Sequence, residues 1–278
     1  MNDQANQSPI LVLGATGKTG RRVAERLRER GVSVRDGSRS ASPAFDWEDK
    51  STWRAALEGS SAAYISYFPD LAAPGAPAAV GAFAERAVEL GVQRLVLLSG
   101  RGEEEAQAAE REMQQAGAEW TVVRASWFSQ NFSEGYMLDP VLSGEVALPV
   151  DGMREPFVDV DDIADVAVAA LTEEGHAGRL YEVTGPRLLT FAEAVGEISR
   201  ASGRQISYVP ISSDEYAAAL TQHDVPAEVI ALLGYLFDEV LDGRNEHLSQ
   251  GVREALGREP RDFGDYARDT AAGGAWNV

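Results

Sequence analysis

The sequence predicts an α/β protein, a doubly wound parallel sheet (Rossmann) with a smaller mixed C-terminal substrate lobe. Apolar runs of strand type alternate with helix-type segments between residues 9 and 125, which favours a parallel sheet with helices on both faces. The first apolar run, residues 9–13, leads directly into closely spaced glycines. From about residue 133 the pattern becomes irregular, which indicates a second lobe.

The composition is that of an ordinary soluble globular protein, with 44% hydrophobic and 25% charged residues in a chain of 278. The net charge of −19 argues against nucleic-acid binding, because the phosphate backbone repels an acidic surface. No apolar run approaches the ~20 residues that a membrane span needs. With no cysteine and three scattered histidines, no metal site is expected. We therefore expect a cytoplasmic protein, a monomer or a homodimer, that binds neither membrane nor nucleic acid.

The stretch after the first strand predicts a dinucleotide site. Its glycines follow a GxxGxxG spacing and are succeeded at once by helix-type periodicity. Glycines permit a tight turn and close backbone approach, while the helix N-terminus offers unpaired N–H groups and a positive dipole to a diphosphate. The predicted cofactor-binding residues of this turn are Gly14, Ala15, Thr16, Gly17, Lys18, Thr19 and Gly20.

The end of the second predicted strand, residues 31–39, bears on the choice of cofactor. In dinucleotide folds this end meets the adenosine ribose, about 20 residues beyond the glycines. Ser38 followed by Arg39 suits the 2′-phosphate of NADP, whereas Asp36 suits the free hydroxyl of NAD if the strand stops early. We expect NADP(H), with NAD(H) as the second choice.

The next elements continue the alternation. We expect a short helix at 52–57, a buried strand at 62–67, a helix at 77–90, a strand at 92–99, a helix opened by the acidic residues 103–105, and a strand at 118–124. Further on, an aspartate caps a helix that carries Ile163 and Leu171, and residues 180–186 return as a strand. Thr190 caps another helix, and residues 209–278 are expected to be helical. The Rossmann domain thus spans 1–132 and is completed by about 156–185, and the smaller lobe comprises 133–155 and 186–278.

Ligands of such sheets bind at the carboxyl ends of the strands. These ends supply the remaining predicted cofactor residues: Tyr67, Phe68 and Pro69 after the third strand, and Ser99, Gly100 and Arg101 after the fourth. Asp46 and Trp47 are added from the loop before residue 50. Trp47 either lies over the adenine or only packs under its loop.

In these segments the chain resembles the NmrA-like members of the atypical short-chain dehydrogenase superfamily. The matching residues are 14–20, 38–39, 45–47, 97–100, 110, 120–124, 127–132 and 157–164, in family order. The resemblance implies a Rossmann domain that binds NADP(H), a small C-terminal substrate lobe and a cleft between them. The family includes NAD(P)H-dependent quinone reductases and also redox-sensing proteins without turnover, so it leaves catalysis open.

The usual acid of short-chain dehydrogenases is missing. Their Tyr-x-x-x-Lys dyad requires a tyrosine four residues before a lysine, but Lys18 and Lys50 are the only lysines and are preceded at that distance by Gly14 and Asp46. We therefore predict an NADP(H)-dependent oxidoreductase that transfers hydride to an electrophilic small molecule of quinone, enone or iminium type. The alternative is a non-catalytic redox sensor that acts through a protein partner.

Four polar residues are the candidates for the remaining catalytic work: Ser99, Tyr67, Tyr136 and Asn131. Each has a structural alternative, because a strand-end serine often satisfies backbone groups and aromatic residues often line a core. The substrate is expected to be apolar and planar, and the walls of its pocket are expected from Tyr67, Phe68, Pro69, Trp127, Phe128 and Tyr136.

Overall fold

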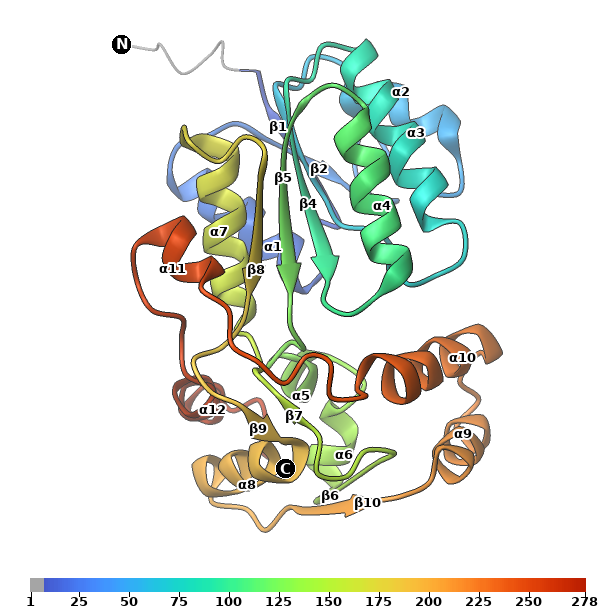
Figure 1. Ribbon diagram of the computed structural model, residues 1–278, viewed down its shortest axis with the longest axis vertical. Helices are drawn as coiled ribbons and strands as arrows, with labels where there is room; N and C mark the ends of the chain where they lie inside the picture. The colour runs from blue at the N-terminus through green and yellow to red at the C-terminus, as the bar shows by residue number, and fades with distance from the viewer. Residues whose placement is uncertain (1–7) are drawn as a thin grey trace. The chain divides into compact units, whose positions relative to one another are not determined.

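The chain folds into two compact units, each built from discontinuous segments (Figure 1). The structure is a computed structural model and describes residues 8–278. The described part of the first unit comprises residues 8–125, 161–183 and 250–258, and the second unit comprises 126–160, 184–249 and 259–278. No helix within residues 8–278 is long and apolar enough to cross a membrane.

A six-stranded parallel sheet forms the centre of the first unit. Its strands lie in the order β2-β1-β3-β4-β5-β8, and every neighbouring pair is parallel. Their bounds are β1 Ile10–Leu13, β2 Val34–Gly37, β3 Ala62–Ile65, β4 Arg94–Gly100, β5 Glu119–Ala125 and β8 Arg179–Val183. From β1 the sheet extends to β2 on one side and to β3, β4 and β5 on the other, so the strand order reverses between β1 and β3. Such a switch point opens a crevice at the carboxyl ends of the strands. The predicted fold class is confirmed.

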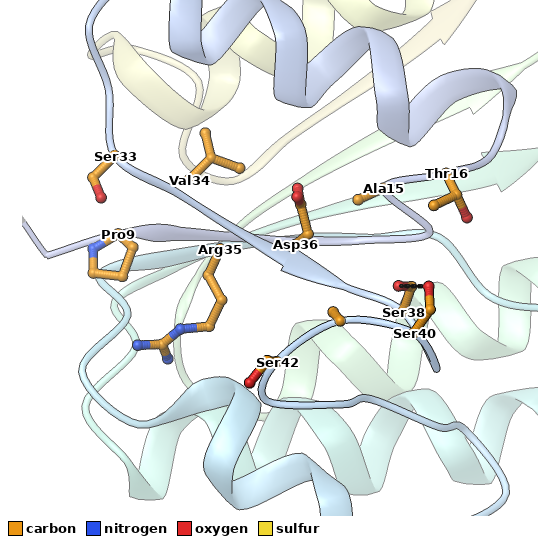
Figure 2. A pocket seen from close by; sticks show the side chains of 11 residues that line it. Pro9, Ala15, Thr16, Ser33, Val34, Arg35, Asp36, Ser38, Ser40 and Ser42 are labelled. Atoms are coloured by element: carbon orange, nitrogen blue, oxygen red, sulfur yellow. Dashed lines mark hydrogen bonds between the residues drawn. The ribbon is translucent and has the colours of Figure 1, made fainter.

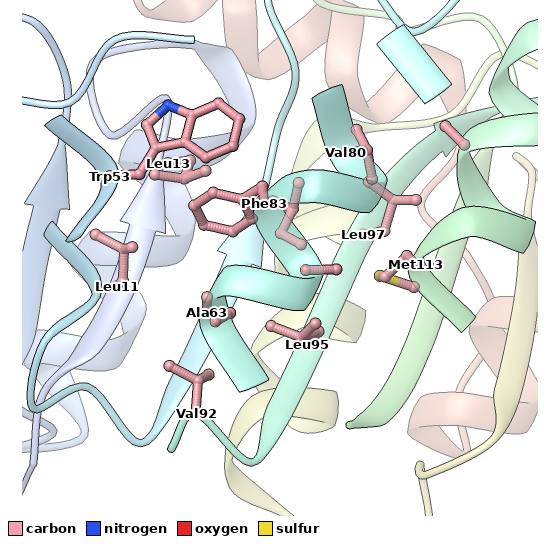
Figure 3. Packing of buried hydrophobic residues seen from close by; sticks show 14 of the residues in the cluster. Leu11, Leu13, Trp53, Ala63, Val80, Phe83, Val92, Leu95, Leu97 and Met113 are labelled. Atoms are coloured by element: carbon pink, nitrogen blue, oxygen red, sulfur yellow. The ribbon is translucent and has the colours of Figure 1, made fainter. Parts of the chain in front are cut away.

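Helices cover both faces of this sheet. One face carries α2 (Trp53–Leu57), preceded by a 3₁₀ turn at Lys50–Thr52, together with α3 (Ala76–Glu89) and α4 (Glu104–Gln115). Alternate residues of the strands, among them Leu11, Leu95 and Leu97, pack there against Val80, Phe83 and Met113 in a fully buried core (Figure 3). The other face carries α1 (Lys18–Glu29) and α7 (Val160–Thr172), joined by ion pairs (Figure 1).

Helix α11 (Gly251–Leu256) returns from far along the chain to the edge strand β8. A Cβ on Gly251 would lie 2.1 Å from the carbonyl oxygen of Glu182, so only glycine allows this approach. The helix thereby covers a strand edge that would otherwise be open to further pairing.

The second unit is an α+β assembly around an aromatic core. Its helices are α5 (Asn131–Glu134), α6 (Leu138–Ser143), α8 (Phe191–Ser202), α9 (Ser213–Gln222), α10 (Ala227–Tyr235), which runs into a π-helical turn at Leu236–Val240, and α12 (Phe263–Ala272). Two small sheets pair β6 (Glu145–Leu148) with β10 (Ser207–Pro210) and β7 (Arg154–Glu155) with β9 (Leu189–Thr190). Phe132, Phe157, Phe191 and Phe263 pack together in the core.

Thr190 caps α8 as predicted, with its hydroxyl accepting from the Glu193 amide at 3.0 Å and the Glu193 carboxylate accepting in return. The expectation of helix from residue 209 onward was wrong at its start. Residues 207–210 form β10, paired in parallel with 145–148. A partner strand some 60 positions earlier decides this conformation, and local periodicity does not reveal such a partner.

The turn between β1 and α1 depends on two glycines. Gly14 has φ +67°, in the left-handed region, and its amide donates to the carbonyl of Gly37 at 2.9 Å. Gly20 lies in the first turns of α1, where an added Cβ would meet the carbonyl oxygen of Gly14 at 2.2 Å. Because Gly20 has no side chain, the first turn of α1 can pack directly against the backbone that follows β1.

We expect Gly20→Ala to reduce the free energy of unfolding by about 1–3 kcal/mol, because the new methyl group overlaps backbone that cannot move away. Urea denaturation followed by circular dichroism measures this loss. Gly17→Ala is the matched control: its Cβ would lie 3.2 Å from the same oxygen and should cost less. Equal losses for the two variants would contradict the close-approach argument.

Candidate active site

The glycine turn presents the N-terminus of α1 as an anion site. Gly17 is the N-cap in extended conformation, no side chain caps the helix, and its first turn contains no acidic residue. The Gly17 amide donates to the Gly14 carbonyl at 2.8 Å, which closes the turn and leaves the following amides at the positive end of a 12-residue helix. This arrangement suits a diphosphate.

A hollow of about 510 Å³ adjoins this turn along β2 (Figure 2). Hydroxyl groups are prominent in its lining, and the Oγ atoms of Ser38 and Ser40 lie 3.2 Å apart. The residues around it are Pro9, Ala15, Thr16, Ser33, Val34, Arg35, Asp36, Ser38, Ser40, Ala41 and Ser42. It runs along β2 from Pro9 and Ser33, at the amino ends of β1 and β2, to Ser38 just after β2, and only this last part lies where the adenosine end of a dinucleotide is expected. The glycine turn and the hollow beside it therefore both fit a dinucleotide cofactor.

The two residues weighed for cofactor choice have different surroundings. Asp36 accepts from Nη2 of Arg28 on α1 at 2.7 and 2.8 Å, so its carboxylate already has a cationic partner. Arg39 is exposed to solvent and lies between Ser38 and Ser40, two residues that line the hollow. The negative charge of Asp36 is thus partly neutralised by Arg28, whereas Arg39 is an exposed cation next to Ser38, which lines the hollow.

Trp47 lies in an aromatic cluster with Phe45, Trp53, Tyr67 and Phe83. Its ring centroid is 4.9 Å from that of Tyr67, and its Nε1 donates to the carbonyl of Ser66 at 3.3 Å. These contacts agree with the second of the two interpretations of Trp47, that its ring packs under the loop. The carbonyl of Asp46 accepts from Nε1 of Trp53 at 2.8 Å, which holds the loop in place.

The segment after β3 carries apolar and phenolic groups to the sheet edge. Phe68 is 69% exposed, which is unusual for a phenylalanine in a folded chain. Burial, and to a lesser extent the carboxylate of Glu48, raises the pKa of Tyr67 above that of free tyrosine. Its phenol therefore keeps its proton at neutral pH.

Ser99, at the end of β4, is buried, and its hydroxyl donates to Oε1 of Glu110 at 2.6 Å. Glu110 also accepts from Nε of Arg124 at 2.9 Å and from its Nη2 at 2.5 Å. The side chain of Arg101 is buried, with Nε 3.4 Å from Oε1 of Glu182. The predicted residues Ser99 and Arg101 thus belong to a charged network that links β4, α4, β5 and β8.

Two carboxyl groups near this network were not singled out from the sequence. Glu103 folds back over Gly100, where an added Cβ would lie 2.1 Å from its Oε1. Burial, followed by the charge of Asp70 and a hydrogen bond to it, raises the pKa of Glu103 well above its usual range. Burial likewise raises the pKa of Asp70. Only the placement of both acids after neighbouring strands, β3 and β4, hinted at their meeting, and the acidic run 103–105 is equally typical of a helix start.

All the predicted cofactor residues lie in the first unit, at or near the carboxyl ends of its strands. The predicted catalytic residues are divided. Ser99 and Tyr67 belong to the first unit, whereas Asn131, the first residue of α5, and Tyr136 belong to the second. Trp127 and Phe128 also belong to the second unit.

Comparison with known proteins agrees with this geometry. The sequence model of a family described as NAD(P)H-binding matches residues 14–174. Agroclavine dehydrogenase of Claviceps fusiformis is 33% identical, over 94% of this chain and 96% of that protein. NAD(P)H azoreductase of Xenophilus azovorans is 28% identical, over 95% of this chain and 98% of that protein.

Among solved structures, the NADPH-dependent quinone oxidoreductase of Escherichia coli in complex with NADPH superimposes with a TM-score of 0.75 at 20% identity, over 94% of this chain and 99% of that one. The fold is thus shared over nearly the whole length. The expected NAD(P)H cofactor, oxidoreductase class and family resemblance are confirmed by these matches. The chain therefore belongs to the NAD(P)H-binding family of NmrA-like, atypical short-chain dehydrogenases.

Proposed function

We propose that this protein uses NADPH to reduce an electrophilic, planar small molecule of quinone, enone or iminium type. The observation that carries the proposal is the glycine turn at the N-terminus of α1, with the hydroxyl-lined hollow of about 510 Å³ beside it. The names of two similar proteins, an azoreductase and a quinone oxidoreductase, support a reductive activity on an organic acceptor, and agroclavine dehydrogenase adds redox chemistry on a small organic molecule.

The chain's residues have definable tasks in such a reaction. When bound, the nicotinamide cofactor supplies a hydride. The amides of residues 18–20, at the positive end of α1, would hold the diphosphate. An electrophilic acceptor takes hydride readily, so the protein mainly orients the reactants and excludes water. No Tyr-x-x-x-Lys dyad is needed for this chemistry, in contrast to the reduction of a simple ketone.

Protons for the reduced product have two candidate sources on the first unit. Tyr67 keeps its phenolic proton at neutral pH, and the Glu103 carboxyl, in contact with Asp70, holds a proton above its usual titration range. Both groups follow neighbouring strands at the carboxyl edge of the sheet. We assign the proton supply to this edge, with Ser99 holding Glu110 and Arg124 in place beneath it.

NADPH should bind more tightly than NADH, and Arg39→Ala should weaken NADPH binding about tenfold while leaving NADH unchanged, since a guanidinium contributes charge-assisted bonds to a 2′-phosphate. Titration of nucleotide fluorescence measures both constants. Arg30→Ala, at the far end of α1 and paired with Glu173 at 2.9 Å, is the matched control. Equal affinity for both nucleotides in the wild type would instead favour Asp36 as the ribose ligand.

Glu103→Gln should increase the free energy of unfolding at pH 8 relative to the wild type, and the difference should shrink toward pH 5. The sign follows from linkage: the native state holds this proton above the unfolded pKa of 4.5, so ionisation at higher pH destabilises the native state. Urea denaturation at the two pH values measures the effect. Glu105→Gln, on the exposed side of α4, controls for the loss of one negative charge. The same pH dependence in both variants would contradict the buried pair.

Steady NADPH oxidation should appear with a panel of quinones and be absent with simple aliphatic ketones, which accept hydride far less readily and are reduced with the help of the Tyr-x-x-x-Lys dyad that this chain lacks. Absorbance at the reduced-nicotinamide band follows the reaction. Tight NADPH binding without oxidation by any electrophile, combined with binding to a protein partner that depends on the redox state of the nucleotide, would replace this proposal by the redox-sensor alternative.

A further inference from the structure

The second unit contains a hollow of its own, with a volume of about 110 Å³. Its lining comes from the loop between β6 and β7, from the junction of β9 and α8, and from β10, all of which belong to this unit. The lining residues are Val150, Asp151, Gly152, Met153, Thr190, Phe191, Ala192 and Tyr208. A hollow of this size holds several water molecules or one small organic group.

The aromatic part of this lining is held in place by the fold. Phe191 is buried, and its ring meets that of Phe157 edge-on with 5.0 Å between centroids. Tyr208 is half-buried, and its hydroxyl donates to the carbonyl of Val150, which ties β10 to the loop before β7. Both rings therefore keep their positions whether or not a ligand is bound.

Asp151 supplies the single charged side chain among the lining residues. Its carboxylate makes no ion pair and no side-chain hydrogen bond within residues 8–278, and it is exposed, so an incoming ligand can reach it. The hydroxyl of Tyr208 does not neutralise it, because that proton is donated to Val150. The two groups are nevertheless close: burial, followed by the charge of Asp151, raises the pKa of Tyr208 above that of free tyrosine.

An anion does not suit this hollow, although α8 begins there. The first amides of α8 are already engaged by its capping box, in which the Thr190 amide donates to the carboxylate of Glu193 at 2.8 Å. An anionic ligand would therefore meet the negative charges of both Glu193 and Asp151. Arg154 follows in the chain, but no ion pair joins it to Asp151 within the described residues.

A metal ion does not suit the hollow either. Hard cations take more oxygen ligands than one carboxylate and a hydroxyl can supply. No cluster of metal-ligating side chains occurs within residues 8–278. The combination of one unpaired carboxylate with aromatic and aliphatic groups is instead typical of sites for ammonium ligands, because aromatic rings attract cations and a thioether such as that of Met153 adapts to alkyl groups.

We propose that the hollow binds a small organic cation, with its charge beside the carboxylate of Asp151 and its alkyl groups against the apolar and aromatic lining. The ligand class is an alkylammonium or quaternary ammonium group of a few carbon atoms, since the volume of about 110 Å³ admits nothing much larger. The site is separate from the proposed reduction, because none of its residues belongs to the unit that carries the glycine turn.

Choline is the probe, and an alcohol in which a carbon atom replaces its charged nitrogen is the uncharged control. Both are titrated into the full chain at constant ionic strength, because a protein with a net charge of −19 attracts any cation diffusely. Amide chemical shifts locate the bound probe. Choline should shift the amides of residues 150–153 and 190–192 in a saturable way, and the uncharged alcohol should bind about tenfold more weakly.

Three variants test the residues. Asp151→Asn should weaken choline binding about tenfold and leave Tm unchanged, since this carboxylate has no partner in the described chain to lose. Ala192→Trp, at an exposed position in the first turn of α8, should fill the hollow and abolish the saturable shifts. Asp214→Asn removes an exposed carboxylate from the first turn of α9 and is the matched control, which should bind choline as the wild type does.

Several results would overturn the inference. Equal affinity for choline and the uncharged alcohol would mean that apolar contact alone fills the hollow. Equal losses in Asp151→Asn and Asp214→Asn would mean that the acidic surface attracts the probe without a site. Saturable binding of acetate at the same amides, or no saturable shift with choline, would likewise refute it. Each of these results leaves the proposed reduction untouched, because that reaction is measured separately by NADPH oxidation.

Discussion

The contact between the first turns of α1 and the end of β1 is the constraint on which the first unit depends. The Gly20 backbone lies against the Gly14 carbonyl, closer than any side chain would permit, and Gly14 itself is left-handed. This packing aims the N-terminus of α1 at the sheet edge and leaves its amides available for an anion. The same residues that allow the fold to close therefore create the cofactor site, so structure and function are not separable at this turn.

Charge is distributed unevenly in a chain with a net charge of −19. Guanidinium groups join the helices behind the sheet: Arg22 and Arg26 pair with Asp161 at 3.1 and 2.6 Å, and Arg26 reaches Asp165 at 2.7 Å. At the carboxyl edge the acidic groups are less fully neutralised. Glu103 and Asp70 contact each other there, and burial is the main cause that raises the pKa of both carboxyl groups. Perturbed carboxyl groups at a ligand-binding edge are typical of functional sites.

The core of the second unit is stabilised by contacts between aromatic rings, whereas ion pairs join helices of the first unit. Phe191 contacts Phe132, Phe157, Phe237 and Trp127, which makes it the centre of this core. Peripheral polar groups are well satisfied, as in the bonds of Arg187 to Glu197 and Asp262 at 2.6 to 2.9 Å.

The sequence by itself determined the parallel sheet, the glycine turn, the alternation through β5 and the cap at Thr190, because each depends on local periodicity, backbone freedom or a short-range hydrogen bond. It also excluded the Tyr-x-x-x-Lys dyad, since neither of the two lysines has a tyrosine four residues before it. Only the tertiary structure decided that residues 207–210 form a strand, that α11 covers β8, that Ser99 donates to Glu110 and that Glu103 meets Asp70. These features join residues distant in the chain or depend on burial, and neither pairing nor desolvation is written into a local pattern.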